Sequence, residues 1–91
     1  SNIGNGAVDA ALNAIKSIVP EKLTLEEYRL EAITGGSDAL CQVSVRIINE
    51  DNIKAIGKSV GSDIVMTSVN ATIEAINKLR KIGKERGKRN E

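Results

Sequence analysis

The sequence predicts an α+β domain of order α-β-β-β-α, with a three-stranded antiparallel sheet and both helices packed on one face. Between residues 23 and 61, apolar and polar residues alternate in three runs separated by turn-forming residues, which is typical of antiparallel strands. On each side of this stretch, apolar residues recur at steps of three and four, as in an amphipathic helix. A length of 91 residues predicts one domain.

The predicted core is aliphatic. The chain is 41% hydrophobic but contains one Tyr and no Phe or Trp. Because an aliphatic side chain buries less area than an aromatic ring, we expect further burial in an oligomer to help stabilise the domain. Cys41 is the only cysteine, so no internal disulfide can form, which favours a reducing, cytoplasmic setting.

The first helix is predicted to begin near Ala7 or Val8 and to stop at Pro20, which cannot continue a helix. Asp9 in its first turn suits the positive end of the helix dipole. No strand precedes this helix, which indicates that part of the domain lies further N-terminal. The apolar stripe comprises Val8, Ala11, Leu12, Ile15 and either Ile18 or Val19.

The first strand is predicted over residues 23–34, with a flaw in its alternation. Leu25 and Tyr28 belong to opposite phases, so we expect a bulge near Glu26 and Glu27 between them. A glycine-rich turn at 35–38 leads to a second strand over 39–48, and a third, weaker strand covers 53–60. Cys41 lies in the apolar phase of the second strand and is expected to be buried.

The last helix is predicted to have Ser62 as its N-cap and Asp63 in its first turn. Gly83 is expected to end it. The chain then divides into a tag remnant or linker at 1–3, a globular domain at 4–82 and a basic disordered tail at 83–91. The apolar stripe of this helix comprises Val65, Val69, Ile73 or Thr72, Ile76, Leu79 and Ile82.

Catalysis and metal binding are not predicted for this chain. There is no His, so neither a Ser-His-Asp nor a Cys-His pair can form within it. One cysteine and scattered carboxylates do not make a metal site. We therefore expect no catalytic residue, no metal ligand and no cofactor.

The net charge of +1 predicts neither nucleic acid nor a membrane as a partner. No apolar run approaches the roughly 20 residues of a membrane span. One alternative stays open, because double-stranded-RNA-binding domains share the order of helix, three strands and helix. Basic residues near the end of the chain could contact phosphates, although the last helix starts with acidic Asp63.

Two glycine-containing stretches, 4–6 and 57–62, each precede a predicted helix. Free N–H groups at a helix start can bind an anion. Taken alone, each stretch is more often a plain turn.

Three motifs in order resemble the C-terminal regulatory domain of 2-isopropylmalate synthases and the related citramalate synthases. The first is Gly-Asn-Gly-Ala-Val-Asp-Ala at 4–10, and the second is Leu-Glu-Glu-Tyr-Arg-Leu-Glu-Ala-Ile-Thr-Gly-Gly-Ser-Asp-Ala at 25–39. The third is Ser-Asp-Ile-Val at 62–65, opening a helix that ends Ala-Ile-Asn-Lys-Leu at 75–79. Ala7 stands where the family usually has proline, and residues 59 and 61 also depart from the family pattern.

The resemblance implies a fold and a role. Such domains contain two strand–strand–strand–helix units and dimerise, so this chain would be half of a double βββα regulatory domain, truncated at its N-terminal strands. The full proteins join acetyl-CoA to a 2-oxo acid on a metal-dependent TIM barrel, for which this chain is too short. It would be the allosteric part alone, not itself an enzyme, with the catalytic barrel of the parent chain as a partner.

The resemblance also implies an effector site for leucine or isoleucine near the interface of a homodimer. Apolar walls would come from the first helix and first strand, small residues would leave room for a branched side chain, and the start of the last helix would hold the polar end. The matching positions are Val8, Leu25, Tyr28, Ala32, Ala39, Gly61, Ser62, Asp63 and Ile64.

The first hypothesis is therefore a regulatory and dimerisation domain that senses a branched-chain amino acid for feedback inhibition. The alternatives are a small nucleic-acid-binding module and a purely structural dimerisation domain. The sequence leaves open which amino acid is sensed, and whether the parent is a 2-isopropylmalate, citramalate or homocitrate synthase.

Overall fold

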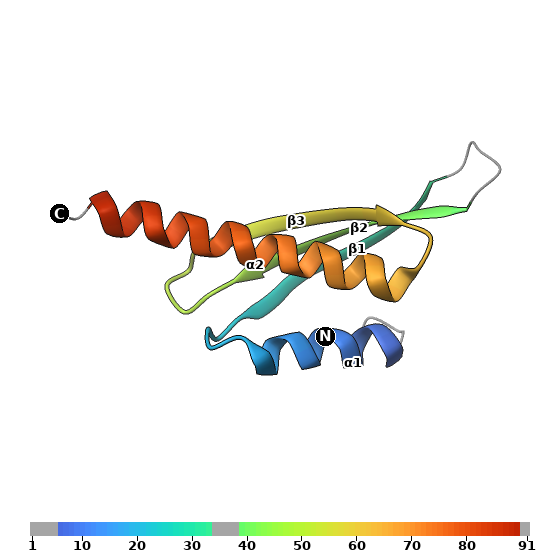
Figure 1. Ribbon diagram of the computed structural model, residues 1–91, viewed down its shortest axis with the longest axis horizontal. Helices are drawn as coiled ribbons and strands as arrows, with labels where there is room; N and C mark the ends of the chain where they lie inside the picture. Colours follow the sequence, from blue (N-terminus) through green and yellow to red (C-terminus); the bar gives the residue numbers. More distant parts are fainter. Residues whose placement is uncertain (1–5, 34–38, 90–91) are drawn as a thin grey trace.

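The computed structural model describes the backbone of residues 6–33 and 39–89, and side chains as far as Lys84 (Figure 1). The order of elements is α1 (Gly6–Ile18), β1 (Thr24–Ile33), β2 (Leu40–Ile48), β3 (Lys54–Gly61) and α2 (Ile64–Arg89). The predicted α+β class and the α-β-β-β-α order are confirmed. The predicted linker at 1–3, the glycine motif at 4–5 and the turn at 35–38 lie outside the described residues.

The three strands form one antiparallel sheet of order β1-β2-β3. The expected bulge is present, because the register between β1 and β2 shifts between Leu25 and Glu27. Leu25 pairs with Ile47 and Tyr28 pairs with Val45, and both partners are buried. The extra residue thus returns both halves of β1 to the face that the helices cover.

The inner face of the sheet packs against α2. Val43, Val45 and Ile47 of β2 are at most 3% exposed, which confirms the predicted apolar face of this strand. Cys41, on the same face, is only half-buried. On α2 the core residues are Ala71, Ala75, Ile76 and Leu79. The outer face carries charged residues, and Arg46 forms ion pairs there with Glu26 and Glu27.

The predicted apolar stripe of α2 is only partly right. Ile76 and Leu79 are buried, as is Thr72, but Ile73 is 43% exposed and Val65 and Val69 are half-buried. The remaining buried positions are small or polar: Thr67, Ser68, Ala71 and Ala75. The physical reason is the close approach of helix and sheet at Gly57, where an added Cβ would come within 2.5 Å of the Ala75 nitrogen. Large side chains do not fit between backbones this close.

Both ends of α2 differ from the prediction. Asp63, not Ser62, is the N-cap, because its Oδ1 accepts hydrogen bonds from the backbone nitrogens of Val65 at 2.8 Å and Met66 at 3.2 Å. The helix also continues past Gly83 to Arg89. A single glycine inside a helix costs only about 1 kcal/mol, and no proline follows to stop the helix. The division of the chain into domain and tail stays a prediction.

The helix α1 lies beside α2 and ends at Ile18, before Pro20, as predicted. Val8 and Leu12 are buried, and Val19 packs against the core, whereas Ile18 is 80% exposed. The stripe therefore continues through Val19. The backbone of α1 approaches that of α2 and none of the described strands, so α1 meets the sheet only through side chains.

Candidate functional site

The two helices run in the same direction and begin at the same end of the molecule (Figure 1). Residues 9–16 of α1 face Thr72 and Ile76 of α2 across one hollow, and residues 15–19 face residues 73–80 across another. The positive ends of both helix dipoles therefore lie on the same side of the molecule. This end gathers most of the positions that sequence reasoning assigned to the effector.

Five of these positions lie at or near the starts of the helices. Val8 is in the first turn of α1 and is fully buried. Gly61 ends β3 opposite Cys41, which pairs in turn with Ala32 of β1. Ser62, Asp63 and Ile64 connect β3 to α2. Ala32 and Ala39 are exposed, at the far ends of the strands.

Tyr28 of β1 forms a hydrogen bond with α2. Its hydroxyl lies 2.6 Å from the Oγ of Ser68, which is fully buried. Thr72 donates in turn to the backbone carbonyl of Ser68 at 2.9 Å. Sequence reasoning missed Ser68, and no signal in the chain could have shown that its hydroxyl meets a tyrosine 40 residues away.

Asp63 already uses one carboxylate oxygen. Its Oδ1 accepts the two backbone N–H groups at the start of α2, and its backbone carbonyl accepts from the nitrogen of Thr67 at 2.9 Å. An ammonium group at this position would therefore compete with, or share, the cap. The capping role is the one that the structure describes.

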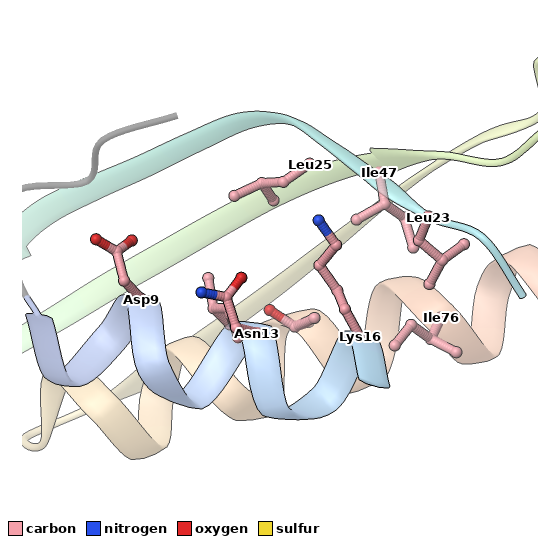
Figure 2. Close-up of a pocket in the computed structure, with 9 residues that line it drawn as sticks. Asp9, Asn13, Lys16, Leu23, Leu25, Ile47 and Ile76 are labelled. Atoms are coloured by element: carbon pink, nitrogen blue, oxygen red, sulfur yellow. The ribbon is translucent and has the colours of Figure 1, made fainter. Parts of the chain in front are cut away.

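A cavity of about 190 Å³ lies between α1 and the inner face of the sheet (Figure 2). Of the nine expected effector residues, only Leu25 lines it. Its apolar wall has contributions from α1, the segment before β1, β1, β2 and α2. The apolar lining residues are Leu12, Leu23, Leu25, Ile47 and Ile76.

The polar side of this cavity belongs to α1. Asp9, Asn13 and Lys16 line it, and Figure 2 shows them in a row with their side chains turned toward the strands. The hydroxyl-bearing Thr72 lines it from α2. Neither Asp9 nor Lys16 forms an ion pair with any other described residue. The sequence does contain a signal for this row, since steps of four and three place the three residues on one helix face.

Ion pairs elsewhere stabilise the periphery. Arg80 of α2 forms a two-pronged contact with Glu21, between α1 and β1, with Nε–Oε2 at 2.6 Å and Nη2–Oε1 at 3.1 Å. This hydrogen bond lowers the pKa of Glu21 and raises that of Arg80. Glu74 accepts from the backbone nitrogen of Lys58 at 3.2 Å, which lowers the pKa of its carboxyl group. Arg80 is thus engaged within the domain.

The described part of the chain contains no group of three or more His, Cys, Asp or Glu side chains that could hold a metal ion. None of its helices is both long enough and apolar enough to cross a membrane.

These features define a small α+β domain with an amphipathic cavity under one helix and a shared end where both helices begin. The sequence matches the family model described as the LeuA allosteric (dimerisation) domain over residues 1–80. The chain belongs to this family, which confirms the resemblance found in its motifs.

The curated relatives are synthases. A probable 2-isopropylmalate synthase from Archaeoglobus fulgidus is 44% identical over 79 residues, covering 87% of this chain and 16% of the relative. A 2-isopropylmalate synthase from Solidesulfovibrio magneticus is 45% identical over 83 residues, covering 91% of this chain and 16% of the relative. A protein from Methanosarcina mazei, named as a candidate (R)-citramalate synthase, is 45% identical over 83 residues, covering 87% of this chain and 17% of the relative. The chain thus spans about one sixth of the length of these relatives.

Proposed function

We propose that this chain is the feedback-sensing and dimerisation domain of a cytoplasmic, acetyl-CoA-dependent 2-isopropylmalate or citramalate synthase. The observation that supports this proposal most directly is the match of residues 1–80 to the LeuA allosteric (dimerisation) family. In this proposal, leucine or isoleucine binds the domain and inhibits a catalytic barrel elsewhere in the parent protein. The chain itself performs no turnover.

The dimerisation part is supported by apolar side chains on the helices. Ile18 is 80% exposed, Met66 54% and Ile73 43%. Ile18 and Ile73 line a hollow of about 220 Å³ between the C-terminal part of α1 and the middle of α2. An aliphatic domain of this size gains stability when such residues are covered in a homodimer.

Most of the effector positions are proposed at the end where the helices begin, whereas Leu25 lies at the opposite end of β1. Val8, Leu25 and Tyr28 would supply apolar wall, and Ala32 and Ala39 would leave room for a branched side chain. The helix start, residues 61–64, would hold the polar end of the amino acid through N–H groups and the helix dipole. Binding regulates only if the amino acid prefers one arrangement of the dimer over another.

The test is calorimetric titration of the chain with leucine, isoleucine and valine, at a concentration where light scattering has fixed the oligomeric state. We expect saturable binding of one of them by a dimer. The preferred ligand would indicate the pathway, since leucine fits the isopropylmalate branch and isoleucine the citramalate branch. Absence of binding by a folded dimer would contradict the sensing role.

The contribution of Asp63 needs a variant that keeps the helix cap. Asp63→Ala removes both the cap and the charge, and loss of the cap alone costs about 1 kcal/mol of stability. Asp63→Asn keeps a capping oxygen and removes only the charge. Weaker binding by Asp63→Asn at unchanged thermal stability would support a contact with the ammonium group. Equal binding by Asp63→Asn would limit Asp63 to its capping role.

A further inference from the structure

The net charge of +1 conceals an uneven distribution of charge along the chain. Residues 1–80 carry eight basic and ten acidic side chains, whereas residues 81–89 carry five basic side chains and one acidic side chain. Such an asymmetry is typical of segments that bind nucleic acid or a membrane surface. The family model matches residues 1–80, so the basic segment lies beyond it. The five basic residues of the segment are Lys81, Lys84, Arg86, Lys88 and Arg89.

We propose that the basic end of α2, residues 81–89, binds double-stranded DNA through its phosphate groups. This activity is separate from the proposed sensing of an amino acid and does not depend on it. The earlier expectation of no nucleic-acid partner rested on the net charge of the whole chain, which averages the basic end with an acidic domain.

The basic end continues α2 but lies outside the core. α2 spans 26 residues, which corresponds to about 39 Å. Its last core residue is Leu79, and residues 80–89 extend the helix by about 15 Å. Figure 1 shows these last turns passing beyond the ends of the strands. Because the backbone of this segment is already helical, a partner that binds it has little backbone to order.

The lysines of this end that the structure describes are available to a partner. Lys81 and Lys84 are exposed and form no ion pair with another described residue. Arg80, immediately before them, is already paired with Glu21. Lys81, Lys84 and Lys88 recur at steps of three and four, which places them on one side of the helix. A row of positive charges along a helix matches the regular spacing of phosphates along a nucleic acid strand.

The shape of this end suits the major groove of B-form DNA. An α-helix with its side chains is about 10–12 Å across, and the groove is about 12 Å wide. Basic helices that continue out of a folded domain bind DNA in this way in other proteins. The major groove of duplex RNA is deep and narrow and does not admit a helix. The geometry therefore favours duplex DNA over duplex RNA.

A membrane surface fits this end less well than DNA does. A helix that lies in a bilayer surface buries an apolar face. Among residues 80–91 the only large apolar residue is Ile82, and it is half-buried in the domain. The segment therefore has charge for a membrane surface but no apolar face to insert.

The acidic residues that the structure describes give this end little to bind on a second copy of the chain. Glu26 and Glu27, on the outer face of the sheet, are already paired with Arg46. The first turn of α2 contains no acidic residue, and the carboxylate of Asp63 before it caps the helix. A DNA duplex, by contrast, carries one negative charge per about 1.7 Å of its axis.

The experiment measures the fluorescence anisotropy of a labelled DNA duplex titrated with the whole chain, between about 50 and 200 mM salt. The test variant combines Lys81→Gln, Lys84→Gln and Lys88→Gln, because glutamine favours a helix as lysine does. We expect it to bind DNA about tenfold or more weakly at the lowest salt. The slope of log K against log salt should also become shallower by about 2–3, since three phosphate contacts are lost.

The matched control combines Lys16→Gln, Lys22→Gln and Lys58→Gln. It removes the same charge from three exposed positions outside α2. We expect it to bind DNA nearly as the unaltered chain does, with the same salt dependence. Both triple variants should keep the thermal stability of the unaltered chain, because the six lysines are exposed or lie beyond the core.

Three results would overturn the inference and leave the proposed function intact. The first is no binding of DNA by the folded chain at about 50 mM salt. The second is an equal loss of affinity in both triple variants, which would mean that DNA responds only to the net charge. The third is binding to an RNA duplex of the same sequence, or to vesicles containing phosphatidylserine, that equals or exceeds the binding to DNA.

Discussion

The two helices cover the same face of the sheet in different ways. The contact of α2 is close, with Gly57 of β3 beneath Ala71 and Ala75. The contact of α1 is open, and a cavity of about 190 Å³ separates it from β1 and β2. The comparison shows two kinds of packing. Small residues bring α2 onto the sheet to form the core, whereas the backbone of α1 approaches α2 and none of the described strands.

The largest effect should come from closing the space under α2. Gly57→Ala places a Cβ against the Ala71 carbonyl and within 2.5 Å of the Ala75 nitrogen, both backbone atoms that cannot move alone. We expect a loss of about 3 kcal/mol or more in the free energy of unfolding, measured with urea. The control is Gly83→Ala, where the added Cβ meets nothing within 4 Å. It should raise stability by about 0.5–1 kcal/mol, because alanine favours the helix.

The next test compares two leucines of equal burial. Leu79 on α2 is 4% exposed and lies in the close-packed core, whereas Leu12 on α1 is 5% exposed and lines the cavity. Leu79→Ala should cost about 3–4 kcal/mol, and Leu12→Ala about 2 kcal/mol, because its side chain already has fewer neighbours to lose. Equal costs in urea denaturation would mean that the cavity is closed in solution.

Local patterns in the sequence were sufficient for the order of elements. The bulge in β1 followed from the opposite phases of Leu25 and Tyr28, and the register of the sheet confirms it. The predicted stripe of α2 was only partly right, because Val65, Val69 and Ile73 have the size and spacing of core residues but are not fully buried. The approach of Gly57, a residue on another element, explains why Ala71 and Ala75 are buried in their place.

The candidate site was less accessible to sequence reasoning. The cavity depends on how far α1 lies from the sheet, a distance that no local pattern encodes. Asp63 and Ser62 can each cap a helix, and the choice between them depends on where β3 ends. The row formed by Asp9, Asn13 and Lys16 was visible as a spacing, but its meaning needed the strands opposite it.

A smaller effect should come from the hydroxyl pair that links β1 to α2. Tyr28→Phe leaves the fully buried hydroxyl of Ser68 without its tyrosine partner, and we expect a cost of about 1–2 kcal/mol. Combined with Ser68→Ala, the double-mutant cycle should give a coupling of about 1 kcal/mol. Ser17→Ala is the control, because that hydroxyl is exposed and bonds only within α1. Additive losses would show that the pair does not form.

The smallest expected effect concerns the ion pair beside α1. The hydrogen bond from Arg80 lowers the pKa of Glu21 below its ordinary value of 4.5. A carboxyl group with a lowered pKa in the folded state stabilises it fully above the unfolded value, and this contribution disappears as the pH falls through the folded value. The difference in stability between the unaltered chain and Glu21→Gln should therefore be constant near neutral pH and shrink below about pH 4.5.

Thermal unfolding at a series of pH values measures this difference, and a second background isolates its cause. In Arg80→Met the cation is absent, so Glu21→Gln should have little effect at any of these pH values. The effect in the unaltered chain should also decrease with added salt, because the side chains of Arg80 and Glu21 are 48% and 30% exposed. A pH dependence that persists in Arg80→Met would mean that another group holds the Glu21 carboxylate. Together with the comparison of Leu79→Ala and Leu12→Ala, this result would show how much the segment after α1 adds to the packing of α1 against α2.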